Sequence, residues 1–202
     1  MNILFISDYV CPYCLVAKEA LKQACAELNI QPEMVYHAFE LTEEPKPRVD
    51  TYNDANRKEH YKILVEPCKQ LGLDMKLPPK VVPRPYSRLA FEGYYYAKDN
   101  GCGEAYNDLI YRAYFIDEKD IGDMDVLCEL AMQAGLDVEG YKKVIDEGVY
   151  SEIEKKSVRE AREIYKIDHV PTIYIDGELA DIKKYTKEEF IEVLTKINKK
   201  DR

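Results

Sequence analysis

A pair of closely spaced cysteines at a predicted strand-to-helix junction constrains this chain more than any other feature of its sequence. Residues 2–6 are a short apolar run, which is typical of a buried strand. From residue 14 to residue 28 apolar side chains recur at helical spacing, and Pro12 suits the first turn of that helix, where no N–H group is needed. Residues 34–41 predict a second strand. The chain therefore opens strand–helix–strand, with Cys-Pro-Tyr-Cys at positions 11–14 on the first junction.

The place of the two cysteines gives them a chemical use. Cys11 lies where the unpaired N–H groups and the positive end of the helix dipole stabilise a thiolate, the nucleophile of thiol–disulfide exchange. The spacing lets Cys14 reach Cys11 and resolve a mixed disulfide within the protein. Half of a zinc site and two unreactive loop thiols are the alternatives. A closed zinc site needs about two more ligands, and the sequence has no second Cys-x-x-Cys and no His-x₃₋₅-His, so no metal is expected.

The middle of the chain, residues 43–167, predicts a helical insertion. Four prolines between residues 78 and 85 exclude a helix there and predict an extended segment. Residues 151–154 have the spacing of a capping box. The helical signals are an apolar stripe over 61–71 kinked by Pro67, a helix from a Ser87 cap to residue 101, and helices over 104–116, 123–135, 138–147 and 151–165.

The last segment returns to strands. Residues 171–175 are β-branched and aromatic, and Asp176-Gly177 is a strong hairpin signal that makes 179–182 the partner strand. Residues 186–189 form a second capping box ahead of the final helix. We therefore expect an α/β fold with three parts, 1–42 and 168–202 around the helical insertion 43–167.

Charge and cysteine usage narrow the class of protein. The net charge of −9 argues against nucleic acid or an anionic membrane as the main partner. The first apolar run has no positive residue before it and is too short for a signal peptide or a membrane span, so a cytoplasmic location is expected. Of the scattered cysteines, Cys25 and Cys68 read as packed core thiols, Cys102 as the exposed one, and Cys128 stays undecided.

A proline stands just ahead of the third predicted strand, in His169-Val170-Pro171-Thr172. It is either an ordinary strand-start proline or the second residue of a cis peptide bond. The composition of the chain does not decide between the two.

These residues together resemble the DsbA-like thioredoxin-fold family, and more closely its cytoplasmic, FrnE-like branch. The resemblance rests on Ser7-Asp8-x-x-Cys11-Pro12-x-Cys14, on Val170-Pro171-Thr172, and on Leu109-x-x-Arg112-Ala113-Tyr114-Phe115 with the residues up to Asp137. It covers nearly the whole chain. It implies a thioredoxin fold with a large all-helical insertion, dithiol–disulfide exchange by Cys11 and Cys14, and a cis bond at Pro171 beside Cys11.

The resemblance also implies a substrate-binding surface around the two cysteines. Its residues would be Val170, Pro171 and Thr172 on the proline loop and Pro12 and Tyr13 on the motif, where Tyr13 is included because the loop must be accessible for exchange. Apart from the resemblance, the charges of Asp8 and His169 make these two the candidate modulating residues. Asp8 could equally be a loop cap, and His169 a solvated loop residue. The expected partners are protein or peptide thiols and disulfides. No cofactor is expected beyond the redox-active cysteines, with glutathione a candidate co-substrate.

Two other functions are alternatives to dithiol–disulfide exchange: another enzyme of the same superfamily and a non-enzymatic binding module. A glutathione-linked small-molecule isomerase or transferase usually carries serine at the nucleophile position, whereas this chain has Cys11, and Pro85-Tyr86-Ser87 stands where such relatives often have Pro-Asn-Thr. A non-enzymatic binding module would use the insertion and be indifferent to both cysteines. The sequence does not give the oligomeric state, the substrate or the direction of exchange.

Overall fold

One mixed sheet organises the chain, seen in a computed structural model that describes residues 1–200. Within these residues the sheet has four strands in the order β2-β1-β3-β4. They are β1 (Asn2–Ser7), β2 (Glu33–Ala38), β3 (Thr172–Ile175) and β4 (Glu178–Leu179). The central strand β1 runs parallel to β2 and antiparallel to β3, with Ser7 opposite Ala38 and Ile6 opposite Thr172. The C-terminal end of β1 and the N-terminal end of β3 therefore lie side by side at the same end of the sheet.

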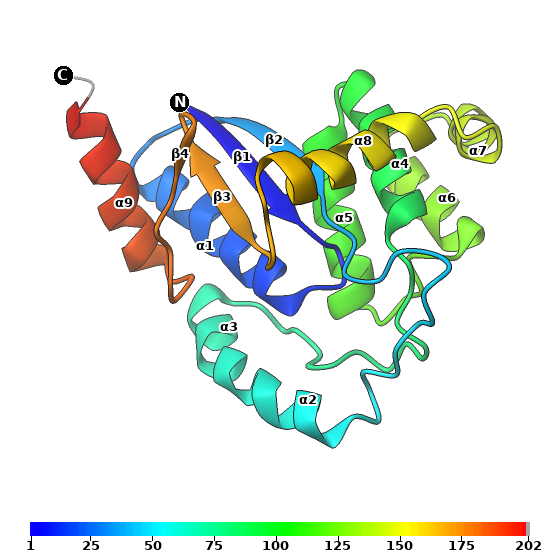
Figure 1. The fold of residues 1–202 in the computed structure, drawn as a ribbon, viewed down its shortest axis with the longest axis horizontal. Helices are drawn as coiled ribbons and strands as arrows, with labels where there is room; N and C mark the ends of the chain where they lie inside the picture. Colours follow the sequence, from blue (N-terminus) through cyan, green and yellow to red (C-terminus); the bar gives the residue numbers. More distant parts are fainter. Residues whose placement is uncertain (201–202) are drawn as a thin grey trace.

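Helices cover both faces of this sheet (Figure 1). On one face α1 (Pro12–Glu27) packs beside α9 (Lys187–Lys200). On the other face α8 (Ser151–Arg159), continued by the π-helical turn η2 (Glu160–Ile164), lies over β2. Side chains on both faces of β1 are buried accordingly, because the successive residues Phe5 and Ile6 are both 0% exposed.

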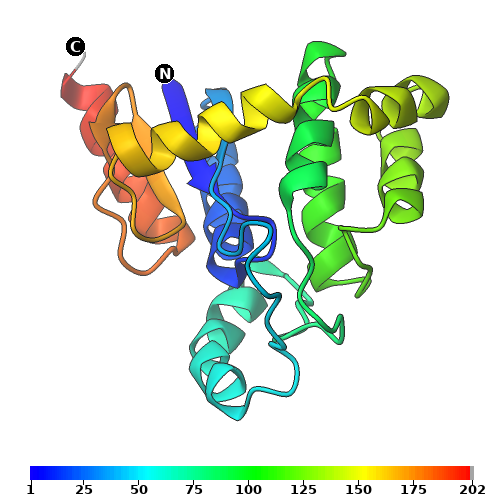
Figure 2. The ribbon, with the colours of Figure 1, turned by 45° about the vertical axis from the view of Figure 1, so that its right-hand side comes forward.

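The insertion forms two groups of helices (Figure 2). The first lies below the N-terminal end of α1, and the second packs beside the sheet, where α4 contacts α5, α7 and α8. The elements of the insertion that precede α8 are α2 (Ala55–Tyr61), the 3₁₀ turn η1 (Lys62–Leu64), α3 (Val65–Leu71), α4 (Arg88–Asp99), α5 (Gly103–Phe115), α6 (Met124–Gln133) and α7 (Val138–Asp146). The architecture confirms the expected α/β thioredoxin fold interrupted by a helical insertion.

The helix signals were correct in kind but not in every boundary. The stripe over 61–71 is not one kinked helix: it divides at η1 (Lys62–Leu64), and Val65 is 56% exposed rather than buried. Pro67 lies in the first turn of α3, where it removes no helical hydrogen bond. Ser87 does occupy the N-cap of α4, although its hydroxyl makes no cap bond there.

The predicted capping box at Ser151 is wrong. Tyr150 is the N-cap of α8, with no side-chain cap. The turn before α8 supplies backbone acceptors instead, because the Ser151 N–H donates to the Gly148 carbonyl at 3.1 Å and the Glu154 N–H to the Tyr150 carbonyl at 2.9 Å. The helix therefore starts one residue earlier than the side-chain pattern indicates.

The predicted hairpin turn is present, but the strand that follows it is shorter than predicted. Asp176 and Gly177 both have positive φ, 48° and 84°, as a tight hairpin turn requires. The partner strand β4 ends at Leu179 rather than continuing to Ile182. The division into 1–42, 43–167 and 168–202 stays a prediction, and residues 201–202 of its last part lie outside the described residues. In the described part of the chain no helix is long and apolar enough to cross a bilayer.

Candidate redox site

The first cysteine of the motif lies at the N-cap of α1. Cys11 has extended dihedrals (φ −94°, ψ 115°), Pro12 follows at the first helical position, and no side chain caps the helix. The Cys11 N–H donates to the Asp8 carbonyl at 3.1 Å, and the Cys14 N–H donates to the Cys11 carbonyl at 3.1 Å. The sulfur of Cys11 is thus held against the uncapped positive end of the helix dipole, as the local sequence predicts.

The second cysteine lies deeper. Cys14 is fully buried, whereas Cys11 is 5% exposed, and both are free thiols here. Burial, together with the hydrogen bond between the two thiols, raises the pKa of Cys14 well above its usual value. The two sulfurs are therefore unequal, with Cys11 toward the surface and Cys14 as a protonated thiol behind it.

The proline loop meets Cys11 across the fold. The thiol of Cys11 donates a hydrogen bond to the carbonyl of Val170 at 3.5 Å, although 159 residues separate them. The Val170–Pro171 bond is cis, the geometry that the resemblance implied. The hydroxyl of Thr172 donates to the His169 carbonyl at 2.9 Å and fastens the turn. This places Val170, Pro171 and Thr172 beside the motif.

Asp8 ties the cysteine loop to the rest of the molecule. Its side chain is fully buried and accepts hydrogen bonds from the Val10 N–H at 3.2 Å and the Leu41 N–H at 2.7 Å. Burial raises the pKa of Asp8, although a hydrogen bond from Ser87 and the charge of Arg84 oppose the rise. These contacts are those of a loop-capping residue, one of the two roles that the sequence left open.

Two other predicted residues lie at the surface. Tyr13 is half-buried, and its ring faces His60 of α2 at a centroid distance of 6.0 Å, so the insertion borders the site. His169 has a side chain that is 72% exposed, and its Nδ1 pairs with Asp168 at 2.6 Å. A modulating role of His169 therefore stays a prediction.

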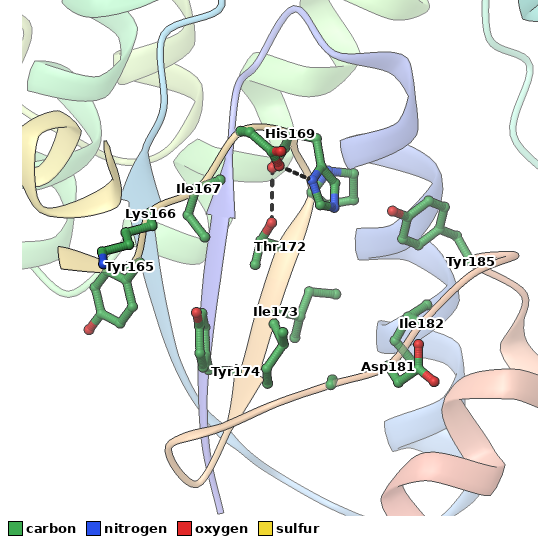
Figure 3. Close-up of a pocket in the computed structure, with 14 residues that line it drawn as sticks. Tyr165, Lys166, Ile167, His169, Thr172, Ile173, Tyr174, Asp181, Ile182 and Tyr185 are labelled. Carbon is green, nitrogen blue, oxygen red and sulfur yellow. Dashed lines mark hydrogen bonds and ion pairs between the residues drawn. The ribbon is translucent and has the colours of Figure 1, made fainter. Parts of the chain in front are cut away.

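A cavity of about 460 Å³ extends from the proline loop along β3 (Figure 3). Pro171 and Thr172 form its wall near the site, and Tyr165 and Tyr174 its far wall, with ring centroids 5.1 Å apart. The Ala180 N–H donates a hydrogen bond to the Ile173 carbonyl at 2.9 Å, and after Ala180 the chain that follows β4 turns away from β3. The edge of β3 next to Pro171 is therefore left open to the cavity.

Sequence reasoning missed Tyr185 on the other wall of this cavity. Burial is the largest cause that raises the pKa of its hydroxyl to about 12, and the charges of Cys14 and Cys11 follow. Nothing in its local sequence indicates a site residue, because only the folded chain brings Tyr185 and Pro171 to the same cavity. The one usable signal was its place immediately before a predicted capping box.

The remaining cysteines are also free thiols. Cys25 and Cys68 are buried, as expected, and the Cys68 thiol lies 3.5 Å from the Met75 sulfur. Cys102, which was expected to be the exposed thiol, is only half-buried, with its thiol 3.5 Å from the Ala97 carbonyl, and Cys128 is half-buried too. Among the described residues no group of three or more His, Cys, Asp or Glu side chains is arranged to hold a metal ion.

Comparison with known proteins agrees with this architecture. The family profile of the DSBA-like thioredoxin domain matches residues 2–188. The uncharacterized protein YwbO of Bacillus subtilis (strain 168) is 34% identical over 176 residues, which are 87% of this chain and 86% of YwbO.

Solved structures show the same fold. The probable DsbA oxidoreductase SCO1869 of Streptomyces coelicolor is similar at 25% identity with a TM-score of 0.78, over 97% of this chain and 89% of that one. At 16% identity the fold recurs in the cytosolic disulfide reductase DsbM of Pseudomonas aeruginosa (TM-score 0.72; 98% and 99% covered) and in 2-hydroxychromene-2-carboxylate isomerase (TM-score 0.75; 100% and 97%). Because a reductase and an isomerase share it, the fold alone does not select the reaction.

Proposed function

Since the chain belongs to the DSBA-like thioredoxin domain family, we propose that it is a thiol–disulfide oxidoreductase whose Cys11–Cys14 pair exchanges with protein or peptide thiols. One observation carries this proposal: Cys11 lies at the uncapped start of α1, against Cys14 on one side and the Val170 carbonyl on the other. An isomerase that used only one thiol would have no need of a second, buried one.

The exchange proceeds in two steps that balance. The Cys11 thiolate attacks one sulfur of a substrate disulfide, so that a Cys11–substrate disulfide forms and one substrate thiolate leaves. Cys14 then gives up its proton and attacks the Cys11 sulfur, which releases the second substrate thiolate. The substrate disulfide gains two electrons and two protons, and the Cys11–Cys14 dithiol becomes a disulfide. The same steps in reverse oxidise a substrate dithiol.

The surroundings of Cys11 support an extended substrate. The open edge of β3 beside Pro171 leaves backbone groups for a polypeptide segment, with Thr172 on the same wall and with Tyr13 and Pro12 on the motif side. Glutathione is the second thiol partner that we propose, and a structure of DsbM with GSH shows this ligand with the same fold. No cofactor beyond the cysteines enters the reaction.

We place this activity in the cytoplasm. Six free cysteines, four of them outside the motif, suit a reducing compartment, where stray disulfides do not accumulate. The structural neighbour DsbM is described as cytosolic.

The test is a trapping experiment with Cys14→Ser. Without the resolving thiol a mixed disulfide on Cys11 persists, so we expect proteins captured from lysate to be released by reductant and identified by mass. The matched control is the Cys11→Ser/Cys14→Ser double variant, which should capture nothing. Capture of glutathione alone, with glutathione-dependent turnover that survives Cys14→Ser, would instead indicate the isomerase or transferase. Capture of nothing by either variant would leave a binding module.

A further inference from the structure

The loop between β4 and α9 is fixed by one carboxylate. Glu189, in the first turn of α9, accepts the backbone N–H groups of three successive residues: Lys183 at 2.9 Å, Lys184 at 2.8 Å and Tyr185 at 3.0 Å. We call this arrangement the Glu189 clasp. In an ordinary capping box the carboxylate would reach back only to the N–H of the cap residue, Thr186. Charge-assisted bonds to three amides make the clasp a firm anchor for the loop.

The clasp holds Tyr185 in a backbone conformation that large residues rarely adopt. Its φ is +52°, in the left-handed region. Such a conformation persists where the surrounding interactions over-determine it, and it is frequent at ligand-binding sites. Here it turns the side chain to a position that lines both the 460 Å³ cavity and a smaller one of about 90 Å³ near α3.

Tyr185 lies across the cavity from the proline loop. In Figure 3 its ring stands on the side of α1, with the hydroxyl end turned toward His169. Pro171 lines the same cavity, and the pKa of the Tyr185 hydroxyl, raised to about 12 by burial and by the nearby cysteines, keeps it protonated at neutral pH. Within the described part of the chain this hydroxyl has no hydrogen-bond partner, so its donor is free.

We propose that Tyr185 is a substrate-positioning residue of the exchange site, whose hydroxyl donates a hydrogen bond to a backbone carbonyl of the disulfide-bearing polypeptide, and that the Glu189 clasp fixes it there. This inference rests on the proposed function and specifies its substrate class. A peptide on the open edge of β3 runs between Pro171 and Tyr185, whereas a small aromatic disulfide offers Tyr185 no carbonyl.

The first experiment compares two disulfides as substrates of Tyr185→Phe, which loses only the hydroxyl. The probes are a disulfide-bonded peptide of several residues and 2,2′-dithiodipyridine. We expect kcat/KM for the peptide to fall about three- to tenfold, mainly through KM, as loss of one hydrogen bond implies. The rate with 2,2′-dithiodipyridine should be unchanged. Tyr150→Phe, which loses a hydroxyl bonded to Asp99, is the matched control and should match the wild type with both probes.

The second experiment tests the clasp. Glu189→Gln should reproduce the loss seen in Tyr185→Phe, and the double variant should lose no more than either single one, because both changes act on the same hydroxyl. Glu188→Gln makes the same charge change on the neighbouring residue, outside the clasp, and should behave as wild type. If the two losses were fully additive, Glu189 would not act through Tyr185, and the proposal that the Glu189 clasp fixes Tyr185 would be overturned.

The two hypotheses fail in different ways. Wild-type protein that exchanges with neither probe would overturn the proposed function and the inference together. Active wild type with an unchanged Tyr185→Phe would overturn only the inference. Equal slowing with both probes would also overturn it, because Tyr185 would then act on the cysteines rather than on the peptide.

Discussion

Burial makes the two cysteines of the proposed redox site chemically unequal. Both belong to one helical turn, yet Cys14 is fully enclosed by the core, and Cys11 retains a small exposed surface. Enclosure holds the pKa of Cys14 well above its usual value, so it stays a thiol at neutral pH. An attacking sulfur at the surface and a protected one behind it are what a resolving mechanism requires.

This asymmetry predicts selective alkylation. In the native dithiol protein, iodoacetamide at neutral pH should modify Cys11 at least about tenfold faster than Cys14, because each unit by which a pKa rises lowers the thiolate fraction about tenfold. Peptide mass mapping after short exposure measures the order of labelling. Cys102, a half-buried thiol whose pKa is also raised by burial, is the internal reference. Labelling of Cys14 or Cys102 ahead of Cys11 would contradict the assignment.

The sequence made some site residues visible and hid others. Asp8, Cys11 and Cys14 lie within one short segment of the chain, so local spacing was enough to single them out. Tyr185 escaped, because its role depends on a turn that no local pattern encodes. The capping-box signal at 186–189 was present, and the Thr186 hydroxyl does accept the Glu189 N–H at 3.3 Å. The carboxylate, however, binds the residues before Thr186, which only the folded loop shows.

At the scale of elements, buried carboxylates lie between the sheet and the insertion. Glu40 follows β2, Glu154 belongs to α8 and Glu92 to α4, and all three are nearly or fully buried. Each has a side-chain oxygen without a hydrogen-bond partner, and Arg88 is 3.8 Å from Glu92. Burial raises the pKa of Glu40 and of Glu154, and the charges of neighbouring carboxylates add to the rise at both groups.

The carboxylates predict a fold that weakens as the pH rises. A raised native pKa means that the folded state holds protons that the unfolded state releases, so stability is complete below the ordinary glutamate value of 4.5 and is lost as the pH rises through the native value. Glu40→Gln should be more stable than wild type at mildly alkaline pH by roughly 1–3 kcal/mol. Urea unfolding at acidic and alkaline pH measures this.

The control for that prediction is Glu152→Gln on α8, the helix that carries Glu154, because the Glu152 side chain is 78% exposed. It should leave the pH dependence as it is in the wild type. A wild-type stability that rises from acidic to alkaline pH would contradict the raised pKa values of Glu40 and Glu154 in the folded state.

Elements were predictable where their signals are local. The helix expected from residue 123 does begin there, and Asp123 caps α6 by accepting hydrogen bonds from the Asp125 and Val126 N–H groups. The start of α8 was not predictable, because the preceding turn supplies its backbone acceptors, and neither was the short β4, because the chain turns away toward the Glu189 clasp. Side-chain patterns indicate that a helix or strand exists, and tertiary contacts decide its ends.

At the scale of the whole molecule, the insertion and the sheet share one core. Tyr9, beside the motif, stacks on Phe91 of α4 with centroids 4.3 Å apart. Buried Lys18 of α1 pairs with Glu104 at 2.8 Å and with Asp108, both of α5. Buried residues of both parts form a single hydrophobic cluster. The helix that carries the two cysteines is therefore packed between the sheet and the insertion.

A shared core predicts one cooperative unfolding transition. Leu127 of α6 and Leu194 of α9 are both fully buried at opposite ends of the molecule. Leu127→Ala and Leu194→Ala should each destabilise by about 2–5 kcal/mol, and each should shift the entire transition, because neither part keeps its core without the other. The unfolding transitions recorded by far-ultraviolet circular dichroism and by tyrosine fluorescence along one urea series should coincide in both variants.

The control is Met132→Ala on the exposed face of α6, where the side chain is 59% exposed. This substitution should shift neither the circular dichroism transition nor the fluorescence transition. Two separate transitions in Leu127→Ala, with the part that contains α9 unfolding at its wild-type midpoint, would instead show that the insertion folds independently of the redox site.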